Sequence, residues 1–152
     1  MKYLNKTIEY ILFAVLAAMS FSMAVNVVCR SLLSFSLSWA DELSQALLVW
    51  LTFLGAAVAV REHLHYSFNY IQQLLKGKAR ICLMLLNDLT VLFCALYMFK
   101  DGIIVTKGIS EWLMPAMGIS RAWVYGACPV GCALMILYVL VDIVNNIKAF
   151  KA

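Results

Sequence analysis

Charged residues are scarce in this chain. They make up 13% of its 152 residues, roughly half of their share in ordinary soluble domains, whereas hydrophobic residues make up 64%. The mean hydropathy is +0.89. A soluble domain of this size could not bury so much apolar surface, and a disordered chain would carry far more charge. The composition therefore indicates a protein whose solvent is a lipid bilayer.

The sequence also lacks the short motifs that carry common enzyme chemistries. It contains no Walker loop, no G-x-G-x-x-G, no H-E-x-x-H and no G-x-S-x-G. His63 and His65 are two residues apart, so they do not share a face of a helix, which disfavours a metal site. We therefore expect no enzyme activity and no cofactor.

Cysteines and basic residues are present without a recognisable pattern. An odd number of cysteines in apolar runs indicates neither a disulfide framework nor a zinc site, and we interpret them as small buried hydrophobes: Cys29, Cys82, Cys94, Cys128 and Cys132. The 12 Lys+Arg and 8 Asp+Glu give a net charge of +4 without a basic run, which argues against a nucleic-acid partner.

Four stretches are apolar enough to cross a bilayer, for which a helix needs about 20 mostly apolar residues. They are residues 8–29, 43–60, 81–99 and 122–141. The first is longer than the apolar core of a signal peptide, about 7–15 residues, so we expect it to be retained. The expected fold is an all-α integral membrane protein, with one membrane domain over residues 1–152 and four transmembrane helices.

Residues 64–75 have the periodicity of a short amphipathic helix. Leu64, Phe68, Ile71 and Leu75 fall on one face, and a basic segment follows. This pattern predicts an interfacial helix on the cytoplasmic surface of the membrane, where its basic end would meet anionic lipid headgroups.

The distribution of lysine and arginine predicts the orientation, because cytoplasmic connections are enriched in both. The side that holds both termini and the 61–80 connection carries eight of them: Lys2, Lys6, Arg61, Lys76, Lys78, Arg80, Lys148 and Lys151. The opposite side carries four: Arg30, Lys100, Lys107 and Arg121. Both termini are therefore expected in the cytoplasm.

Two of the spans are preceded by signals for the start of a helix. Ser38 is expected to cap the second span, with Asp41 and Glu42 in the first turn, where acids suit the positive end of the helix dipole. A second interpretation, compatible with the first, is that these acids face a partner or pair with Arg30. Ser120 is expected to cap the fourth span in the same way.

Other residues predict how the helices sit and pack. Trp39 and Trp123 lie at the depth of the membrane interface, and Pro129 predicts a kink inside the fourth span. Small residues recur four apart, which permits close helix contact within the chain or with another chain. Examples are Ala14, Ala18 and Ser22; Gly55 and Ala59; Ala122 and Gly126; and Ala127 and Gly131.

Asp88 is a charge deep within a span. A charged Asp near the bilayer centre costs about 2.5–3.5 kcal/mol on insertion scales, so an intramembrane acid is a functional candidate by default. No Lys, Arg or His lies at matching depth in the other spans. A single carboxyl group beside Asn87 is weak evidence for a path that conducts protons or ions. We favour a protonated or hydrogen-bonded Asp88 that faces a partner subunit.

Several motifs, in this order, resemble those of one family. They are Arg30 closing the first span, residues 38–43 (SWADEL) opening the second, residues 56–62 (AAVAVRE) with His65 closing it, and residues 115–129 (PAMGISRAWVYGACP) leading into the fourth. The pattern resembles the small permease subunit (DctQ-like) of tripartite ATP-independent periplasmic (TRAP) transporters over most of the chain. It departs near His65, where the family would have a glycine before the histidine and a short aliphatic-acidic stretch after it.

The resemblance implies a bacterial inner-membrane protein whose partners are a large permease subunit, a periplasmic substrate-binding protein and membrane lipids. The large subunit would carry the substrate and ion sites. An ion gradient, usually sodium, would drive uptake of an organic acid such as a dicarboxylate, a sialic acid or another sugar acid. The small subunit would enlarge the static scaffold and help to dock the binding protein. Structural or partner-contact roles would then fall to Arg30, Trp39, Asp41, Glu42, Arg61, His65 and Trp123.

Two other functions remain open at this stage. A stand-alone homodimeric transporter would use Asp88 as its coupling acid, and its purified chain would transport solute without a partner. A membrane-embedded enzyme would need a cluster of His, Cys or acidic residues, and the sequence offers none.

Overall fold

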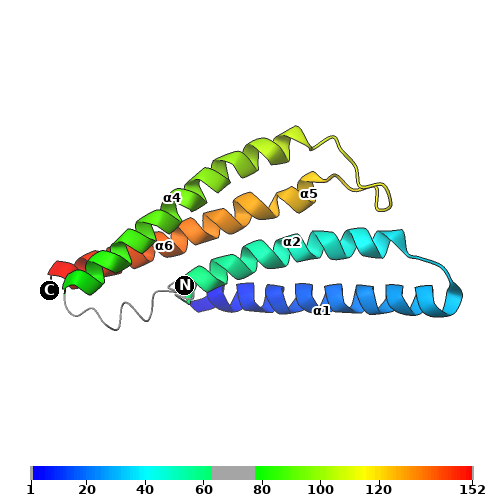
Figure 1. Ribbon diagram of the computed structural model, residues 1–152, viewed down its shortest axis with the longest axis horizontal. Coiled ribbons are helices and arrows are strands. Elements are labelled where there is room, and N and C mark those ends of the chain that lie inside the picture. Colours follow the sequence, from blue (N-terminus) through cyan, green and yellow to red (C-terminus); the bar gives the residue numbers. More distant parts are fainter. Residues whose placement is uncertain (1, 63–77, 152) are drawn as a thin grey trace.

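The computed structural model describes residues 2–62 and 78–151, which form four long helices and one short helix (Figure 1). The long helices are α1 (Lys2–Leu33), α2 (Ser38–Arg61), α4 (Lys78–Gly108) and α6 (Ala127–Lys151), and the short one is α5 (Ala122–Tyr125). In this part of the chain, strand-like pairing is limited to one antiparallel bridge between Leu113 and Ser120. The predicted all-α fold class is confirmed.

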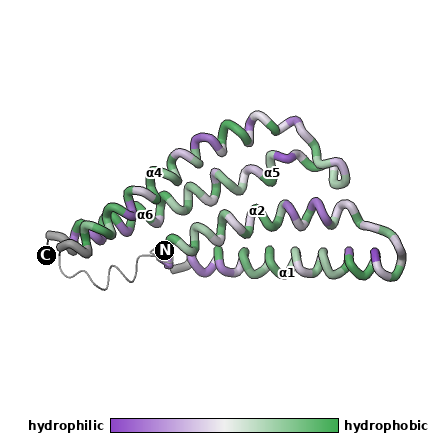
Figure 2. Tube along the Cα trace, viewed as in Figure 1, coloured by the Kyte–Doolittle hydropathy of each residue, from purple (hydrophilic) through white to green (hydrophobic). Residues whose placement is uncertain are grey.

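Each predicted span lies within a helical segment that is long and apolar enough to cross a membrane. These segments are Asn5–Leu32, Ser38–Arg61, Ile81–Gly108 and Ala122–Lys148. They run past the predicted limits because a charged residue at the end of a span does not stop a helix. For example, α4 continues through Lys100 and Asp101 to Gly108. Figure 2 shows that the middle of α1 is hydrophobic and that hydrophilic residues lie toward its ends. These features indicate a multi-pass membrane protein.

The long helices are arranged in the order α1, α2, α6, α4. Helix α1 packs against α2, α2 against α6 and α6 against α4, and no other pair of the long helices packs extensively within the described residues. The helices at the two edges are the least covered, since 11% of the span residues are buried in α1 and α4, against 22% in α2 and 28% in the segment that contains α6. The described residues therefore form an open layer rather than a closed bundle, and they leave its broad faces uncovered.

The two ends of this layer differ. Lys2 and Lys151, the first and last residues described, lie at what we call the terminal end, and the connection between α4 and α5 lies at the opposite end, the hairpin end (Figure 1). A compact apolar core lies toward the terminal end, formed by Ile8, Ala57, Val60, Tyr138 and Val139. The hydroxyl group of Tyr138 donates a hydrogen bond to Oδ1 of Asn5 over 3.0 Å. This core joins α1, α2 and α6.

One predicted small-residue pair makes a close contact within the chain. Ala127 is fully buried. A Cβ atom added at Gly131 would lie 2.7 Å from Cβ of Phe53 and 2.9 Å from its carbonyl oxygen. A Cβ atom added at Gly55, by contrast, would have nothing within 4 Å. The spacing of small residues thus serves the α2–α6 contact at Gly131, and not at Gly55.

The predicted helix starts need correction. The residue that caps α2 is Leu37, and no side chain caps that helix, so the prediction for Ser38 is wrong. The Leu37 N–H instead donates to Oδ1 of Asn26 over 3.0 Å, so a residue of α1 fixes the start of α2. At the fourth span the capping residue is Arg121, although the Ser120 hydroxyl does accept the Ala122 N–H over 3.2 Å.

The fourth span, in which Pro129 predicts a kink, is divided into α5 and α6. The helix is interrupted at Gly126, three residues before Pro129. Proline has no N–H to donate to the carbonyl group of Tyr125, four residues earlier, which weakens the helix at this point. The predicted interfacial helix at residues 64–75, together with His63 and His65, lies outside the described residues.

Candidate functional site

Residues 109–121 fold back on themselves as an irregular hairpin between α4 and α5. The N–H groups of Met114 and Arg121 donate to the carbonyl groups of Ile119 and Trp112, each over 2.8 Å. Gly118 has a φ of +67°, a conformation that glycine adopts without strain, and it closes the turn with a 2.8 Å bond to the Met114 carbonyl group. The hairpin therefore has a defined shape of its own.

Glu42 fastens this hairpin to the first turns of α2. Its carboxylate accepts the Ala116 N–H over 3.0 and 3.1 Å and the Met117 N–H over 2.9 Å. Hydrogen bonds from an N–H group to a carboxylate are stronger than those between neutral groups. The acid that was predicted to face a partner is thus used within the chain, to hold the tip of the hairpin.

Asp41, the neighbouring acid, holds the turn between α1 and α2. Its Oδ1 accepts a 2.7 Å hydrogen bond from Nδ2 of Asn26, and the same Asn26 side chain accepts the Leu37 N–H. One helical turn earlier, the hydroxyl groups of Ser22 and Ser44 lie 2.9 Å apart in a hydrogen bond. Asn26 is 7% exposed. Sequence reasoning missed Asn26, although a lone amide within an apolar span is itself a signal, because polar groups in spans face protein.

Arg30 pairs with neither of these acids. Both salt bridges among the described residues belong to Arg61, whose Nη2 lies 2.6 Å from Glu9 and 2.7 Å from Glu62. Arg30 is exposed in the last turn of α1, so the structure does not support its predicted pairing with Asp41 or Glu42. Arg61 fastens α2 to α1 at the terminal end, opposite to Glu42.

Asp88 is buried between α4 and α6, with 3% of its surface exposed. Its Oδ2 accepts a 2.8 Å hydrogen bond from Nδ2 of Asn146. The predicted hydrogen bonding is present, but the side chain faces its own chain and not a partner subunit. The prediction considered only Lys, Arg and His as partners in the spans, and so overlooked the amide of Asn146.

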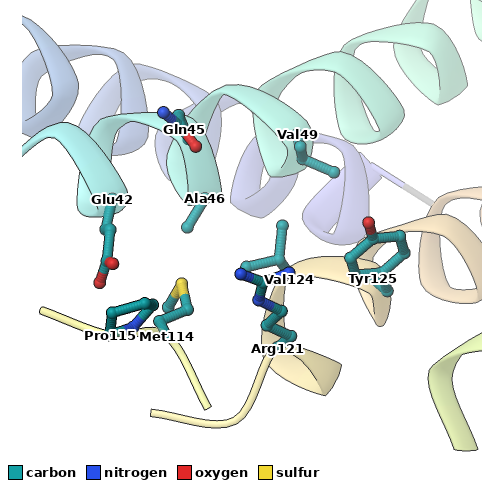
Figure 3. A pocket seen from close by; sticks show the side chains of 9 residues that line it. All are labelled: Glu42, Gln45, Ala46, Val49, Met114, Pro115, Arg121, Val124 and Tyr125. Atoms are coloured by element: carbon teal, nitrogen blue, oxygen red, sulfur yellow. The ribbon is translucent and has the colours of Figure 1, made fainter. Parts of the chain in front are cut away.

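A pocket with a mixed polar and apolar lining lies at the hairpin end, between α2, the hairpin and α5 (Figure 3). Its volume is about 400 Å³, and its polar lining consists of Glu42, Gln45, Arg121 and Tyr125. Figure 3 shows Glu42 and Arg121 on the two sides of Met114. We call this the hairpin pocket. No group of three His, Cys, Asp or Glu residues suited to a metal ion occurs in the ranges that the structure covers.

Comparison with known proteins gives the family. Residues 19–149 match the family described as "Tripartite ATP-independent periplasmic transporters, DctQ component". The chain belongs to this DctQ family. The resemblance found in its motifs is confirmed, and the chain is a small subunit of the TRAP transporter type.

Curated relatives of this DctQ chain agree with the family. It is 26% identical to a putative TRAP transporter small permease protein of Haemophilus influenzae, over 95% of the chain and 90% of the relative. It is also 26% identical to the sialic acid TRAP transporter small permease protein SiaQ of Vibrio cholerae, over 97% of the chain and 85% of the relative. A third relative, the sialic acid TRAP transporter permease protein SiaT of H. influenzae, is 28% identical over the whole chain, which spans a quarter of the length of SiaT.

The most specific motif of the DctQ resemblance, residues 38–43, stands at the centre of the hairpin end. Asp41 holds the α1–α2 turn and Glu42 holds the hairpin, so both acids shape the chain itself. The tryptophans remain open to their surroundings: Trp39 is 45% exposed and Trp123 is 70% exposed. In this DctQ chain, the tryptophans rather than the acids are available for contact with lipid or a partner.

Proposed function

We propose that this chain is the small membrane subunit of a secondary TRAP transporter, in which it enlarges the fixed scaffold around a large permease subunit. The observation that carries the proposal is the open layer of helices in the order α1, α2, α6, α4. A layer of this kind offers broad apolar faces to a neighbouring membrane protein. Large side chains on both edge helices support this, since Phe13 and Phe21 of α1 and Phe93 of α4 are each more than 70% exposed.

The scaffold role needs a layer that keeps its shape while a mobile element beside it moves. Polar contacts between neighbouring elements at both ends of the layer help it to keep its shape. Arg61 joins α2 to α1 at the terminal end, and Glu42 joins α2 to the hairpin at the other. The mobile element of a transporter carries its substrate across the bilayer by moving relative to a fixed scaffold. The contacts made by Arg61 and Glu42 would help this layer to serve as part of that scaffold.

We place the terminal end in the cytoplasm of a bacterial inner membrane, because eight of the twelve Lys and Arg residues belong to that side. The hairpin end then faces the periplasm. Trp112 and Leu113 of the hairpin are 63% and 60% exposed, so they are suitable contacts for a soluble binding protein that delivers substrate. Glu42 holds the same hairpin in place.

The proposed substrate is an organic acid, and sialic acid is the leading example because two of the relatives carry it in their names. The proposed driving force is an ion gradient, probed first with sodium. The chain itself would not touch the substrate, because the two acids at the hairpin end, Asp41 and Glu42, are engaged in holding the α1–α2 turn and the hairpin.

The experiment is purification of the tagged chain from its native membrane in mild detergent, followed by reconstitution into liposomes. We expect a large polytopic protein to co-purify in fixed ratio, and sodium-driven uptake only when that protein and a soluble binding protein are both present. The chain alone should transport nothing. A discrete homodimer of the chain with uptake of its own, abolished by Asp88→Asn, would instead establish the stand-alone transporter.

A further inference from the structure

Helix α2 is one of the two inner helices of the layer, yet one of its sides remains uncovered. Beyond its first turn, the exposed residues of α2 are Gln45, Leu48 and Thr52. Their spacing of three and four residues places them on the same side of a helix. We call the broad face of the layer on this side the Gln45 face.

The Gln45 face also carries two charged side chains that have no partner in the described part of the chain. Arg121 lines the hairpin pocket together with Gln45, and Asp101 lines an adjoining pocket of about 390 Å³ that shares part of its lining. Both charged residues are half-buried, and neither forms a salt bridge or a side-chain hydrogen bond with a described residue. Glu42 does not serve Arg121, since it lies on the other side of Met114 and holds the hairpin (Figure 3).

Two of these polar groups lie well inside the membrane-spanning segments. Gln45 is seven residues into α2, and Asp101 is seven residues before the end of α4, so each lies about 10 Å along its helix from the hairpin end. Polar side chains at such depth face protein or a water-filled cavity, because hydrocarbon offers them no hydrogen bond. The Gln45 face therefore calls for an integral membrane protein with complementary groups, rather than for lipid tails or a soluble protein.

The opposite broad face carries no such groups around its hollow. Leu43 and Gln45 are two residues apart, so they point to opposite sides of α2. Leu43, Leu47 and Trp50 line a hollow of about 690 Å³, and none of the residues that line it is charged or carries an amide. The indole N–H of Trp50 already donates to the Trp123 carbonyl group over 3.0 Å. This face can meet lipid tails without leaving these groups unsatisfied.

The Gln45 face also leaves room for a helix of another chain. Gly55 and Ala59 continue the side of α2 that carries Leu48 and Thr52, at spacings of three and four residues. A Cβ atom added at Gly55 would have nothing within 4 Å, so no described part of the chain fills this space. Small residues allow helix backbones to approach closely in membranes. A partner helix can therefore lie against α2 beside the polar groups.

We propose that the Gln45 face is the surface with which this chain packs against the large permease subunit. The large subunit supplies an acidic group to Arg121, a basic or amide group to Asp101, and a helix that lies against Gly55. The opposite face then meets lipid. This inference rests on the proposed function, because it names the side of the scaffold subunit that meets its partner.

The first test places a photoreactive benzophenone amino acid at Leu48, on the Gln45 face, or at the adjacent Leu47, which lines the opposite hollow. Membranes that contain the whole transporter are irradiated, and a second sample is solubilised without irradiation to measure co-purification of the large subunit. We expect cross-linking to the large subunit from Leu48, and several-fold less from Leu47.

The outcomes of this test separate the inference from the proposed function. If the large subunit co-purified but cross-linked only from Leu47, or equally from both positions, the inference would be overturned and the proposed function would stand. A cross-linked product from Leu48 with twice the mass of the chain would assign the Gln45 face to a second copy and overturn the inference as well. If no large subunit co-purified, the proposed function itself would fail, and the inference with it.

The second test measures the Kd between the purified chain and the large subunit in detergent. Arg121→Gln and Asp101→Asn should each raise this Kd about tenfold or more, because each leaves a charged or polar group of the partner unpaired in the interface. Gly55→Leu should also raise it by filling the space for the partner helix, although the chain itself should still fold. Arg30→Gln and Glu111→Gln remove exposed charges at the same end and should leave the Kd unchanged. Equal weakening by these controls would reduce the effect to general surface charge and overturn the inference.

Discussion

The carboxylate of Glu42 accepts the backbone N–H of Met117 over 2.9 Å, although 75 residues separate them in the sequence. This contact, together with the neighbouring bond from Ala116, decides where the 109–121 hairpin lies. Among the hydrogen bonds of the described residues, those accepted by Glu42 are the ones that tie the hairpin to α2.

Replacing Glu42 with glutamine should therefore loosen the hairpin. The change keeps the size of the side chain but removes its charge and one of its two acceptor oxygens, at a cost of about 1–3 kcal/mol. Hydrogen exchange measured on the chain in nanodiscs should show faster exchange at Ala116 and Met117. Glu62→Gln, at an exposed acid of the terminal end, is the control and should leave these amides unchanged. Unaltered exchange in Glu42→Gln would contradict the role given to this side chain.

Asn26 makes the sharpest prediction for stability. Asn26→Ala leaves the half-buried Asp41 carboxylate and Leu37 N–H without their partner, so the free energy of unfolding should fall by about 1–3 kcal/mol. Unfolding in mixed detergent micelles measures the change. Asn145→Ala removes the same kind of side chain from an exposed position on α6 and should alter the free energy little. Equal effects of the two substitutions would show that the α1–α2 turn does not depend on Asn26.

Gly131 tests the closeness of α2 and α6. A Cβ atom there would lie 2.7 Å from the Phe53 side chain and 2.9 Å from its carbonyl oxygen, and the latter cannot move without moving the helix. Gly131→Ala should thus lower the free energy of unfolding by about 1–3 kcal/mol, as overpacking of a close contact does. Gly55→Ala, on α2 in open space, is the matched control and should be neutral or slightly stabilising, since alanine favours a helix. Thermal unfolding in detergent compares the two, and a stable Gly131→Ala would mean that the helices are farther apart.

The apolar spans could be predicted from the sequence because the bilayer acts on each helix separately. Length and hydrophobicity alone locate residues 81–99 in a helix, although not its extension through Lys100 and Asp101. Contacts between distant segments could not be predicted in this way. Ser38 has the local pattern of a cap, but the start of α2 is fixed by Asn26, whose effect depends on how α1 returns beside α2.

The same difference between local features and long-range contacts applies to the candidate site. Asp41 and Glu42 could be singled out because acids in the first turn of a span suit the positive end of the helix dipole, and the family match covers both residues. Their partners could not be identified, because the Asn26 amide and the backbone of Ala116 become neighbours only after the helices pack. The prediction that Asp41 or Glu42 pairs with Arg30, a residue of opposite charge, was therefore wrong.

Asp88 provides the prediction that separates a subunit from a stand-alone transporter. Its carboxyl group is buried and accepts a hydrogen bond from Asn146, which an asparagine oxygen at position 88 can also accept. Asp88→Asn should consequently leave sodium-driven uptake by the reconstituted complex within about twofold of the original rate, because no proton or ion needs to bind there. Asp88→Leu cannot accept that bond and should lower the yield of folded protein, since it leaves the half-buried Asn146 amide without its acceptor. Uptake measured against the sodium gradient is the deciding quantity. If the Asp88→Asn protein folded but its uptake no longer depended on sodium, the Asp88 carboxyl group would be a coupling group. This chain would then take part in the transport step itself.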